Sequence, residues 1–397
     1  MATVHIIGAG LAGLTAASTL AREGHYVQVY EASPAAGGRC KLLYDEGDNT
    51  GFDGCNALVF GAQSRVMRLA ETYGTAHTLQ PIGLGGEGFD SKARAMRARL
   101  AYLMPPAMPL VDWMDLIGLL TAPSHRTVAD VFDYYHPLRE RYIEPLCRSL
   151  MFATPEDANA RIFARRLLYL WRRGMKGMRL MVPKHSLYQT LIAPALHQIE
   201  QEGGAVYYGQ QVKRLEFRHG RVSGFDMARQ KKVLRAEDQV ILALPPLALA
   251  SLLPGMVAAE QVETRDVASV VFELPALQEP MLTPLTRGVA DWAKGGDGRL
   301  TVTAYAPERV MQQDNQAVAR RFWREVAPML RLPQDDMPKA RVVKERKAVA
   351  RFKRAVALPE NLVCAGDAFG PQYLPPLEAA IASAEMAAYK IRDRIAR

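Results

Sequence analysis

The sequence predicts an α/β protein whose parallel sheet is begun at one end of the chain and completed at the other. An apolar strand, a glycine-rich turn, an alanine-rich helix and a second strand follow one another between Thr3 and Tyr30. A further apolar strand and a long helix lie near the C-terminus, over 361–395. Between them the apolar periodicity is first mostly helical and then mostly that of strands, which indicates a second, α+β unit.

The first turn has the spacing of a dinucleotide-binding site. Gly8, Gly10 and Gly13 directly follow the apolar run Val4 to Ile7. Gly8 makes the tight turn, Gly10 lets the backbone approach a pyrophosphate, and Gly13 lets the helix pack closely on the strand. The phosphates are then expected at the N-terminus of the helix. The alternative is a unit of the same fold that binds no ligand.

An acidic residue and a second glycine turn indicate which nucleotide is bound. Glu31 ends the second strand, 18 residues after Gly13, where a carboxylate accepts hydrogen bonds from ribose hydroxyls and disfavours a 2′-phosphate. Gly37, Gly38 and Arg39 follow. An NAD site does not need this second turn, whereas an FAD site uses such an arginine to meet the pyrophosphate from its other side.

The C-terminal strand ends in a motif that suits the flavin end of FAD. Gly366 and Asp367 follow this strand, and a helix is predicted over 378–395. The carboxylate accepts hydrogen bonds from ribityl hydroxyls or lies near the pyrophosphate. The helix N-terminus favours the negative charge that builds on the ring when it is reduced. The two motifs together predict FAD rather than NAD.

Two further segments are expected to contact the cofactor. The small-residue loop over 54–61 brings backbone close to the isoalloxazine ring, or is a plain connecting turn. Backbone groups near Val212 reach the adenine. The complete predicted cofactor site consists of Gly8, Gly10, Leu11, Ala12, Gly13, Glu31, Ala32, Gly37, Gly38, Arg39, Gly54, Cys55, Asn56, Val212, Gly366, Asp367 and Leu374.

The chain is too long, at 397 residues, for one ordinary hydrophobic core. We expect a Rossmann-like FAD-binding domain made of 1–75, 190–255 and 350–397. An α+β substrate domain, made of 76–189 and 256–349, is interleaved with it and forms a sheet over the substrate cavity. The other predicted elements are a hairpin over 42–53, helices over 63–73, 127–135, 138–152, 157–173, 187–202 and 315–329, and strands over 205–208, 212–217, 221–225, 239–244, 268–274 and 299–304.

The charge and composition of the chain limit the kinds of partner that it is expected to bind. The net charge of +9 indicates either a basic, soluble surface or attraction to anionic lipid or diphosphate groups. The sequence disfavours nucleic acid as a partner because the cations are spread along the chain without a binding motif. The four cysteines are scattered, which disfavours a zinc site or disulfides. With a strand beginning at Thr3 and no basic leader before it, we expect a cytoplasmic protein.

Two apolar segments raise the question of membrane contact. Ala101 to Leu120 is mostly apolar, but its three prolines and two aspartates exclude a spanning helix. It either lines a substrate tunnel, dips into the membrane interface on the inner face, or is a buried core helix. Trp171 to Val182 mixes basic and bulky apolar residues and is either a membrane-surface segment or a solvated loop.

These motifs resemble the large flavoprotein group of amine oxidases and phytoene desaturases. The finer resemblance is to the squalene-associated FAD-dependent desaturases, or hydroxysqualene dehydroxylases, of hopanoid and squalene biosynthesis. It rests on the glycine fingerprint with Gly37 to Cys40, on Pro145 to Arg161, on Leu242 to Pro254 and on the C-terminal Ala-Gly-Asp. The resemblance implies a lipophilic isoprenoid substrate and reductive removal of an allylic hydroxyl by hydride from reduced flavin.

The sequence departs from this family where the flavin face is expected. The family shows Gly-Gln-His where this chain has Gly54, Cys55 and Asn56, and a Trp and Gly-Leu-Pro where this chain has 368–378. Tyr373 and Asp53 are candidate proton donors, with Asn56 as an orienting group. The alternatives are an isoprenoid desaturase, an amine oxidase and a non-catalytic flavin-binding partner protein.

Overall fold

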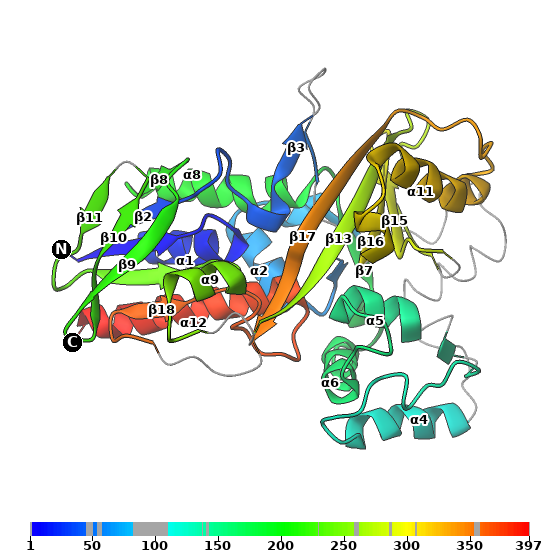
Figure 1. Cartoon of the computed structure of the whole chain (residues 1–397), viewed down its shortest axis with the longest axis horizontal. Helices are drawn as coiled ribbons and strands as arrows, with labels where there is room; N and C mark the ends of the chain where they lie inside the picture. The colour runs from blue at the N-terminus through cyan, green and yellow to red at the C-terminus, as the bar shows by residue number, and fades with distance from the viewer. Residues whose placement is uncertain are drawn as a thin grey trace.

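The computed structural model describes residues 2–44, 51–53, 58–81, 110–136, 138–139, 143–228, 230–257, 262–285, 288–305, 308–352 and 358–396. Its parallel sheet collects strands from both ends and the middle of the chain (Figure 1). In spatial order the strands are β18 (Leu362–Cys364), β12 (Gln239–Leu242), β1 (Thr3–Ile7), β2 (Tyr26–Tyr30) and β8 (Ala205–Tyr207). Every neighbouring pair is parallel, as the sequence predicts.

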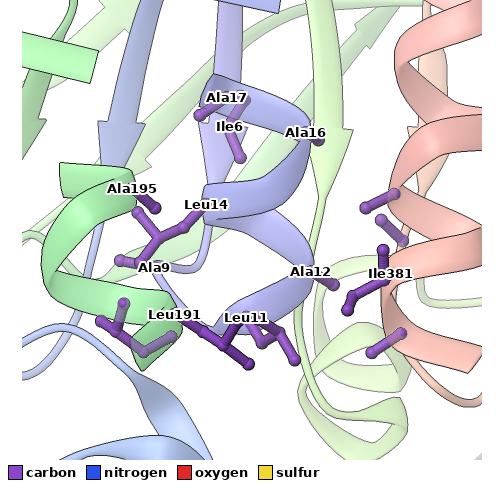
Figure 2. Close-up of a cluster of buried hydrophobic side chains, with 14 of the residues drawn as sticks. Ile6, Ala9, Leu11, Ala12, Leu14, Ala16, Ala17, Leu191, Ala195 and Ile381 are labelled. Carbon is purple, nitrogen blue, oxygen red and sulfur yellow. The ribbon is translucent and has the colours of Figure 1, made fainter. Parts of the chain in front are cut away.

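Three helices cover one face of this sheet. They are α1 (Leu11–Arg22), α8 (Ala193–Gln201) and α12 (Pro376–Ala396). Figure 2 shows α1 between the other two, with Leu14 facing Ala195 of α8 and Ala12 facing Ile381 of α12. The alanine-rich sequence of α1 permits this close packing because small side chains let neighbouring helices approach each other. Burial of these apolar side chains is the main stabilising term of this half of the molecule.

The opposite face is covered by an antiparallel meander and a short helix. The meander is β9 (Val212–Arg218), β10 (Arg221–Met227) and β11 (Lys231–Val233), and the helix is α9 (Pro246–Leu252). Phe225 and Leu249 pack there against Ile7 and Leu242 of the sheet. The predicted meander is therefore confirmed. The strand predicted over 239–244 ends two residues early because Pro245 begins the turn into α9, which the sequence analysis missed.

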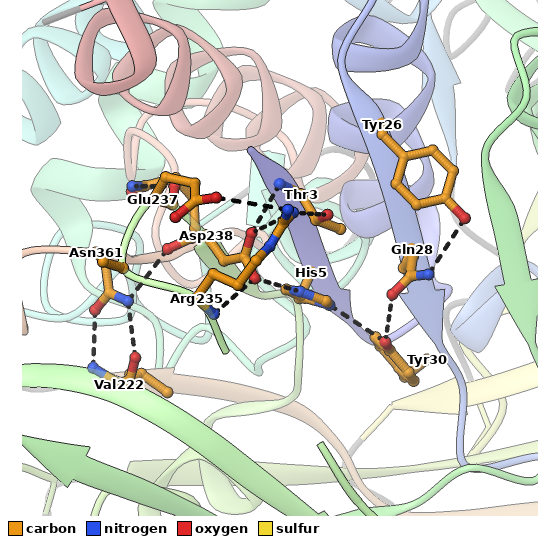
Figure 3. A network of polar contacts seen from close by, with 12 residues as sticks. Thr3, His5, Tyr26, Gln28, Tyr30, Val222, Arg235, Glu237, Asp238 and Asn361 are labelled. Atoms are coloured by element: carbon orange, nitrogen blue, oxygen red, sulfur yellow. Dashed lines mark hydrogen bonds and ion pairs between the residues drawn. The ribbon is translucent and has the colours of Figure 1, made fainter. Parts of the chain in front are cut away.

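A polar network closes the amino edge of the parallel sheet (Figure 3). The Asp238 carboxylate accepts hydrogen bonds from the backbone N–H groups of Thr3 and Arg235, both at 2.9 Å. His5 Nε2 lies 3.6 Å from Asp238 Oδ2, and His5 Nδ1 lies 3.2 Å from the hydroxyl oxygen of Tyr30. Burial lowers the pKa of His5 to about 4. The histidine is therefore neutral at pH 7 and acts as a core residue.

The segment that follows Gly37 to Cys40 contains, where the structure describes it, short strands and the helix α2. The hairpin predicted over 42–53 is confirmed, since Leu42 pairs with Asp53 and Tyr44 with Gly51. This hairpin consists of β3 (Leu42–Tyr44) and β4 (Gly51–Asp53), and it is followed by β5 (Val59–Phe60), α2 (Ser64–Thr72) and β6 (Leu79–Pro81). Strand β7 (Leu180–Pro183) comes from further along the chain. Strand β7 lies between β5 and β6 and thereby connects this segment with the helical insertion.

The helical insertion is less regular than predicted. In the part of it that the structure describes, the helices are α4 (Leu110–Thr121), α5 (Glu144–Met151), α6 (Ala160–Trp171) and α7 (Gly174–Met178). The helix predicted over 127–135 is wrong. Asp130 accepts from the backbone N–H of Thr127 at 2.8 Å, and Asp133 from that of Tyr135 at 2.9 Å, so side chains take backbone donors and stabilise turns instead. Helix α6 begins later than predicted because Asn159 caps it.

The second sheet is antiparallel and lies beside the helical insertion (Figure 1). Its strands, in spatial order, are β14 (Met281–Pro284), β15 (Trp292–Gly296), β16 (Arg299–Tyr305), β13 (Val262–Glu273) and β17 (Ala340–Phe352). A short α10 (Glu308–Met311) precedes α11 (Asn315–Leu330), which was predicted almost in full. Phe322 and Trp323 of α11 pack against Phe272 of β13. The sequence analysis identified two of these five strands.

Candidate flavin and substrate site

The glycine turn after β1 combines two packed glycines with one open one. Gly8 has φ +106°, and a Cβ there would lie 2.4 Å from the carbonyl oxygen of Ala243. A Cβ on Gly13 would lie 2.0 Å from the carbonyl oxygen of Gly8. A Cβ on Gly10 would meet no atom closer than 4.0 Å, where Gly38 Cα lies. Packing therefore requires glycine at two positions, while the third leaves room for a ligand.

The start of α1 is suited to an anion. Gly10 is its N-cap residue, no side chain caps the helix, and its first turn carries no acidic residue. The first N–H groups of a helix have no partner within the helix, and the helix dipole places a partial positive charge there. Leu11 and Ala12, which begin this turn, are buried. The available donors at this point are thus backbone groups, as a pyrophosphate requires.

Glu31 holds the two loops at the carboxyl edge of the sheet. Its Oε2 accepts a hydrogen bond from Ala9 N at 2.8 Å, and its Oε1 accepts from the backbone and hydroxyl of Ser33 at 2.8 and 2.6 Å. The Glu31 carbonyl accepts from Gln210 N at 2.7 Å, which brings the start of β9 near Val212 beside the acid. Ala32, the next residue, is exposed.

The glycine turn that contains Arg39 lies next to the C-terminal motif that contains Asp367, although the two are far apart in the sequence. Gly37, with φ +113°, donates its N–H to the carbonyl of Ala9 at 2.8 Å. Arg39 Nη2 lies 2.6 Å from Asp367 Oδ1, in an ion pair whose arginine side chain is 41% exposed. Gly366, with φ +145°, donates to Ser383 Oγ at 2.8 Å. Residues predicted to bind opposite halves of one cofactor therefore lie side by side.

Behind the C-terminal motif lies a buried carboxylate that the sequence analysis missed. Glu378, in the first turn of α12, is 0% exposed. It accepts hydrogen bonds from the backbone N–H of Arg65 at 3.0 Å and of Val66 at 3.1 Å, and from the Tyr169 hydroxyl at 2.7 Å. Burial and this last bond raise the pKa of Tyr169 to about 12. The only local signal was an acid in an otherwise apolar stretch after two prolines.

The candidate proton donors are only partly described. Tyr373 is 44% exposed, and its ring centroid lies 6.3 Å from that of Tyr169. Leu374 beside it is buried in the core of the helical insertion. Asp53 belongs to β4, but its side chain and the whole of Gly54, Cys55 and Asn56 lie outside the described residues. The structure thus places one of the three predicted catalytic residues.

A cavity of about 200 Å³ opens between the second sheet and the segment that follows β7. Its lining includes Lys184, His185, Lys294, Asp297 and Arg299. His185 Nδ1 lies 3.5 Å from Asp297 Oδ2. Apolar residues, among them Val182, Pro183 and Pro280, share this lining with the charged groups. None of the predicted cofactor-binding residues that the structure describes belongs to the lining, so no substrate is assigned to this cavity.

Comparison with known proteins identifies the family. Residues 11–391 match the family of flavin-containing amine oxidoreductases. A hydroxysqualene dehydroxylase from Rhodopseudomonas palustris is 29% identical, covering 87% of this chain and 86% of the relative. Another hydroxysqualene dehydroxylase, from Zymomonas mobilis, is 25% identical over 98% of each chain.

The fold agrees as well. The solved structure of cyclohexylamine oxidase from Brevibacterium oxydans matches with a TM-score of 0.69 and 16% identity, covering 100% of both chains. At that identity the likeness concerns the fold alone. Since the family match spans nearly the whole sequence, the chain belongs to the flavin-containing amine oxidoreductases and is an FAD-dependent oxidoreductase.

Proposed function

We propose that this enzyme removes the allylic hydroxyl group of hydroxysqualene and produces squalene. The observation that carries the proposal is the similarity to hydroxysqualene dehydroxylases over most of both chains. In this reaction the carbon–oxygen bond breaks, a hydride takes the place of the oxygen, and a proton joins the departing hydroxide so that water leaves. Reduced FAD, when bound, supplies the hydride.

We assign the cofactor-binding roles to residues at the carboxyl edge of the parallel sheet. Gly10 and the first turn of α1 would receive the pyrophosphate, and Arg39 would meet it from the other side. Glu31 would bind the adenosine ribose, with backbone near Val212 beside the adenine. Asp367 would bind the ribityl chain. The uncapped helix and the open space at Gly10 support this assignment.

The protein's own part in the chemistry is to orient the substrate and to provide a proton. Tyr373 is the described candidate for protonating the departing oxygen. Asp53, at the end of β4, is the second candidate donor, and Asn56 would orient the substrate through a hydrogen bond. The apolar core that adjoins Leu374 would keep water from the reacting carbon. The division into an FAD-binding and a substrate domain, with the boundaries given above, is part of this proposal.

The decisive experiment is a single turnover without oxygen. The purified FAD-loaded enzyme is reduced with dithionite, freed of excess reductant and mixed with detergent-dispersed hydroxysqualene. We expect about one squalene for each flavin reoxidised, measured by mass spectrometry and visible absorbance. No squalene, with the flavin still reduced, would refute the proposal. Extra double bonds formed by oxidised enzyme and an added acceptor would indicate a desaturase instead.

A matched pair of variants tests the proton donor. Tyr373→Phe should slow the reoxidation of flavin by hydroxysqualene about a hundredfold, the usual range for loss of a general acid. Tyr389→Phe removes a hydroxyl from a comparably exposed tyrosine on the outer part of α12 and should leave the rate unchanged. Equal rates in both variants would exclude Tyr373 as the donor.

We also propose that the enzyme is cytoplasmic and makes peripheral contact with the inner membrane face, where a lipophilic substrate dissolves. Within the described ranges, no helix has the length and apolar character needed to cross a bilayer. Any membrane contact through these ranges would therefore be at the surface of the bilayer.

A further inference from the structure

Helix α4 presents an apolar face to solvent. Leu116 and Leu119 are 7% and 1% exposed and pack into the core of the helical insertion. On other sides of the same helix, Met114 is 64% exposed, Ile117 58% and Leu120 40%. A surface helix normally carries polar residues at such positions. Contiguous exposed apolar side chains of this kind mark an interaction site.

Two further exposed side chains, both tyrosines, lie in the turn that contacts α4. Tyr134 and Tyr135 are 79% and 88% exposed, and their rings meet edge to face at 5.4 Å. The turn that carries them is tied to α4, because His136 Nε2 lies 3.0 Å from Asp115 Oδ2. Tyrosine, with an apolar ring and a polar tip, is enriched where protein meets the boundary between lipid and water. We call Met114, Ile117, Leu120, Tyr134 and Tyr135 the α4 surface.

Positive charge borders the α4 surface. Arg161 of α6 donates from Nε to the carbonyl of Ala122, just beyond the end of α4, at 3.1 Å. Arg165, one turn further along α6, is exposed, as is Arg126 in the loop after α4. Three aspartates lie nearby: Asp115 contacts His136, while Asp130 and Asp133 accept hydrogen bonds from the backbone N–H groups of Thr127 and Tyr135. They keep their negative charge, so the arginines and these acids alternate around the α4 surface. The whole chain carries a net charge of +9.

We propose that the α4 surface docks on a bilayer that contains anionic lipids. The apolar side chains would enter the headgroup region while the arginines remain among the lipid phosphates, which is the usual arrangement of an interfacial helix. In Figure 1 α4 lies at the lower edge of the molecule, away from the parallel sheet, so the flavin half would stay in water. The proposal rests on the proposed function only for its purpose, since an isoprenoid substrate dissolves in that bilayer.

Vesicle sedimentation of the FAD-loaded enzyme tests the proposal. Vesicles of phosphatidylcholine with one quarter phosphatidylglycerol are compared with pure phosphatidylcholine, at low salt and in 0.5 M NaCl. We expect binding to the anionic vesicles and its weakening by salt. The double variant Met114→Gln/Ile117→Gln should bind at least tenfold more weakly. The variant Met386→Gln is the control, because Met386 is 55% exposed but belongs to α12.

The arginines are tested separately. Arg126→Gln/Arg165→Gln should bind anionic vesicles more weakly by about fivefold for each charge removed, with no change on neutral lipid. Arg320→Gln/Arg324→Gln removes two exposed charges from α11 and should have no effect. All variants must keep bound flavin and their turnover of detergent-dispersed substrate. Membrane docking and the proposed reaction can therefore fail independently.

Three results would overturn the proposal. One is absence of wild-type binding to anionic vesicles. Another is an equal loss of binding in the α4 variant and in its α12 control. The third is self-association of the wild type that the α4 variant abolishes without any vesicle binding, which would make the α4 surface an interface between two copies of this chain.

Discussion

The two edges of the parallel sheet differ in what their polar groups contact. At the amino edge, Asp238, His5 and Asn361 are almost fully buried and contact other parts of the protein (Figure 3). The amide of Asn361 bonds both the N–H and the carbonyl of Val222, at 2.8 and 2.9 Å. At the carboxyl edge, α1 begins without a side-chain cap, and the Arg39 side chain that meets Asp367 is 41% exposed.

This difference shows that the two edges of one sheet have different roles, since the amino edge stabilises the fold and the carboxyl edge is open to a ligand. Buried polar groups destabilise a protein unless they are hydrogen-bonded, so the amino edge contributes to stability only as a complete network. Groups at the carboxyl edge keep solvent-accessible bonding capacity, which a ligand can use. Substitutions at the amino edge should therefore change stability without changing FAD affinity, and open positions at the carboxyl edge should do the reverse.

The largest effect on stability is expected in the glycine turn after β1. There a packed position, Gly13, and an open position, Gly10, lie only three residues apart. Gly13→Ala should destabilise the apo-protein by about 3 kcal/mol, the upper range for overpacking, because its Cβ would lie 2.0 Å from the Gly8 carbonyl oxygen. Gly10→Ala should leave apo-protein stability nearly unchanged and weaken FAD binding. Urea denaturation and flavin titration measure the two quantities. Equal destabilisation by both substitutions would contradict the distinction between packed and open glycines.

The same turn shows why part of the fold could be predicted from sequence. A strand, a glycine turn and a helix are local, so their residues determine their geometry. Helix α11 and parts of β13 and β16 followed from periodicity, whereas β17, with its many charged residues, did not. The contacts of Glu378 with Arg65, Val66 and Tyr169 join residues 209 or more positions apart, and no local pattern announces them. The helix expected over 127–135 failed because Asp130 and Asp133 compete for backbone donors, which periodicity ignores.

The second predicted effect is a pH dependence of stability that arises from His5 at the amino edge. The pKa of folded His5 is about 4, against 6.5 in an unfolded chain, because burial outweighs the attraction of Asp238. Between these values the unfolded chain binds a proton that the folded one does not. The contribution of His5 to the free energy of unfolding is therefore complete above pH 6.5. It decreases by about 3 kcal/mol as the pH falls towards 4, at roughly 1.4 kcal/mol per pH unit.

Urea denaturation between pH 4.5 and 7 should reveal this loss. His5→Gln should flatten the acid side of the stability profile, while His197→Gln, at an exposed position on α8, should not. The second sheet opposes the trend, because burial raises the pKa of Asp291 to about 6 despite its 2.6 Å bridge to Arg148. That carboxyl favours the folded state as the pH falls from 6 to 4. If the free energy of unfolding of the His5 variant falls with pH as steeply as that of the wild type, His5 does not cause the loss of stability in acid.

The smallest effect on stability, and the sharpest test of the carboxyl edge, is expected at Arg39. An ion pair with an exposed partner contributes at most about 1 kcal/mol, so Arg39→Gln should barely shift the unfolding of the apo-protein. Its loss should still weaken FAD binding about tenfold, since a charge-assisted hydrogen bond to phosphate is stronger than one between neutral groups. Arg324→Gln on α11 controls for the loss of one positive charge. If the Arg39 variant unfolds much more easily yet binds FAD normally, the ion pair with Asp367 stabilises the fold and does not serve the cofactor. In that case the proposed difference between the two edges of the sheet is wrong.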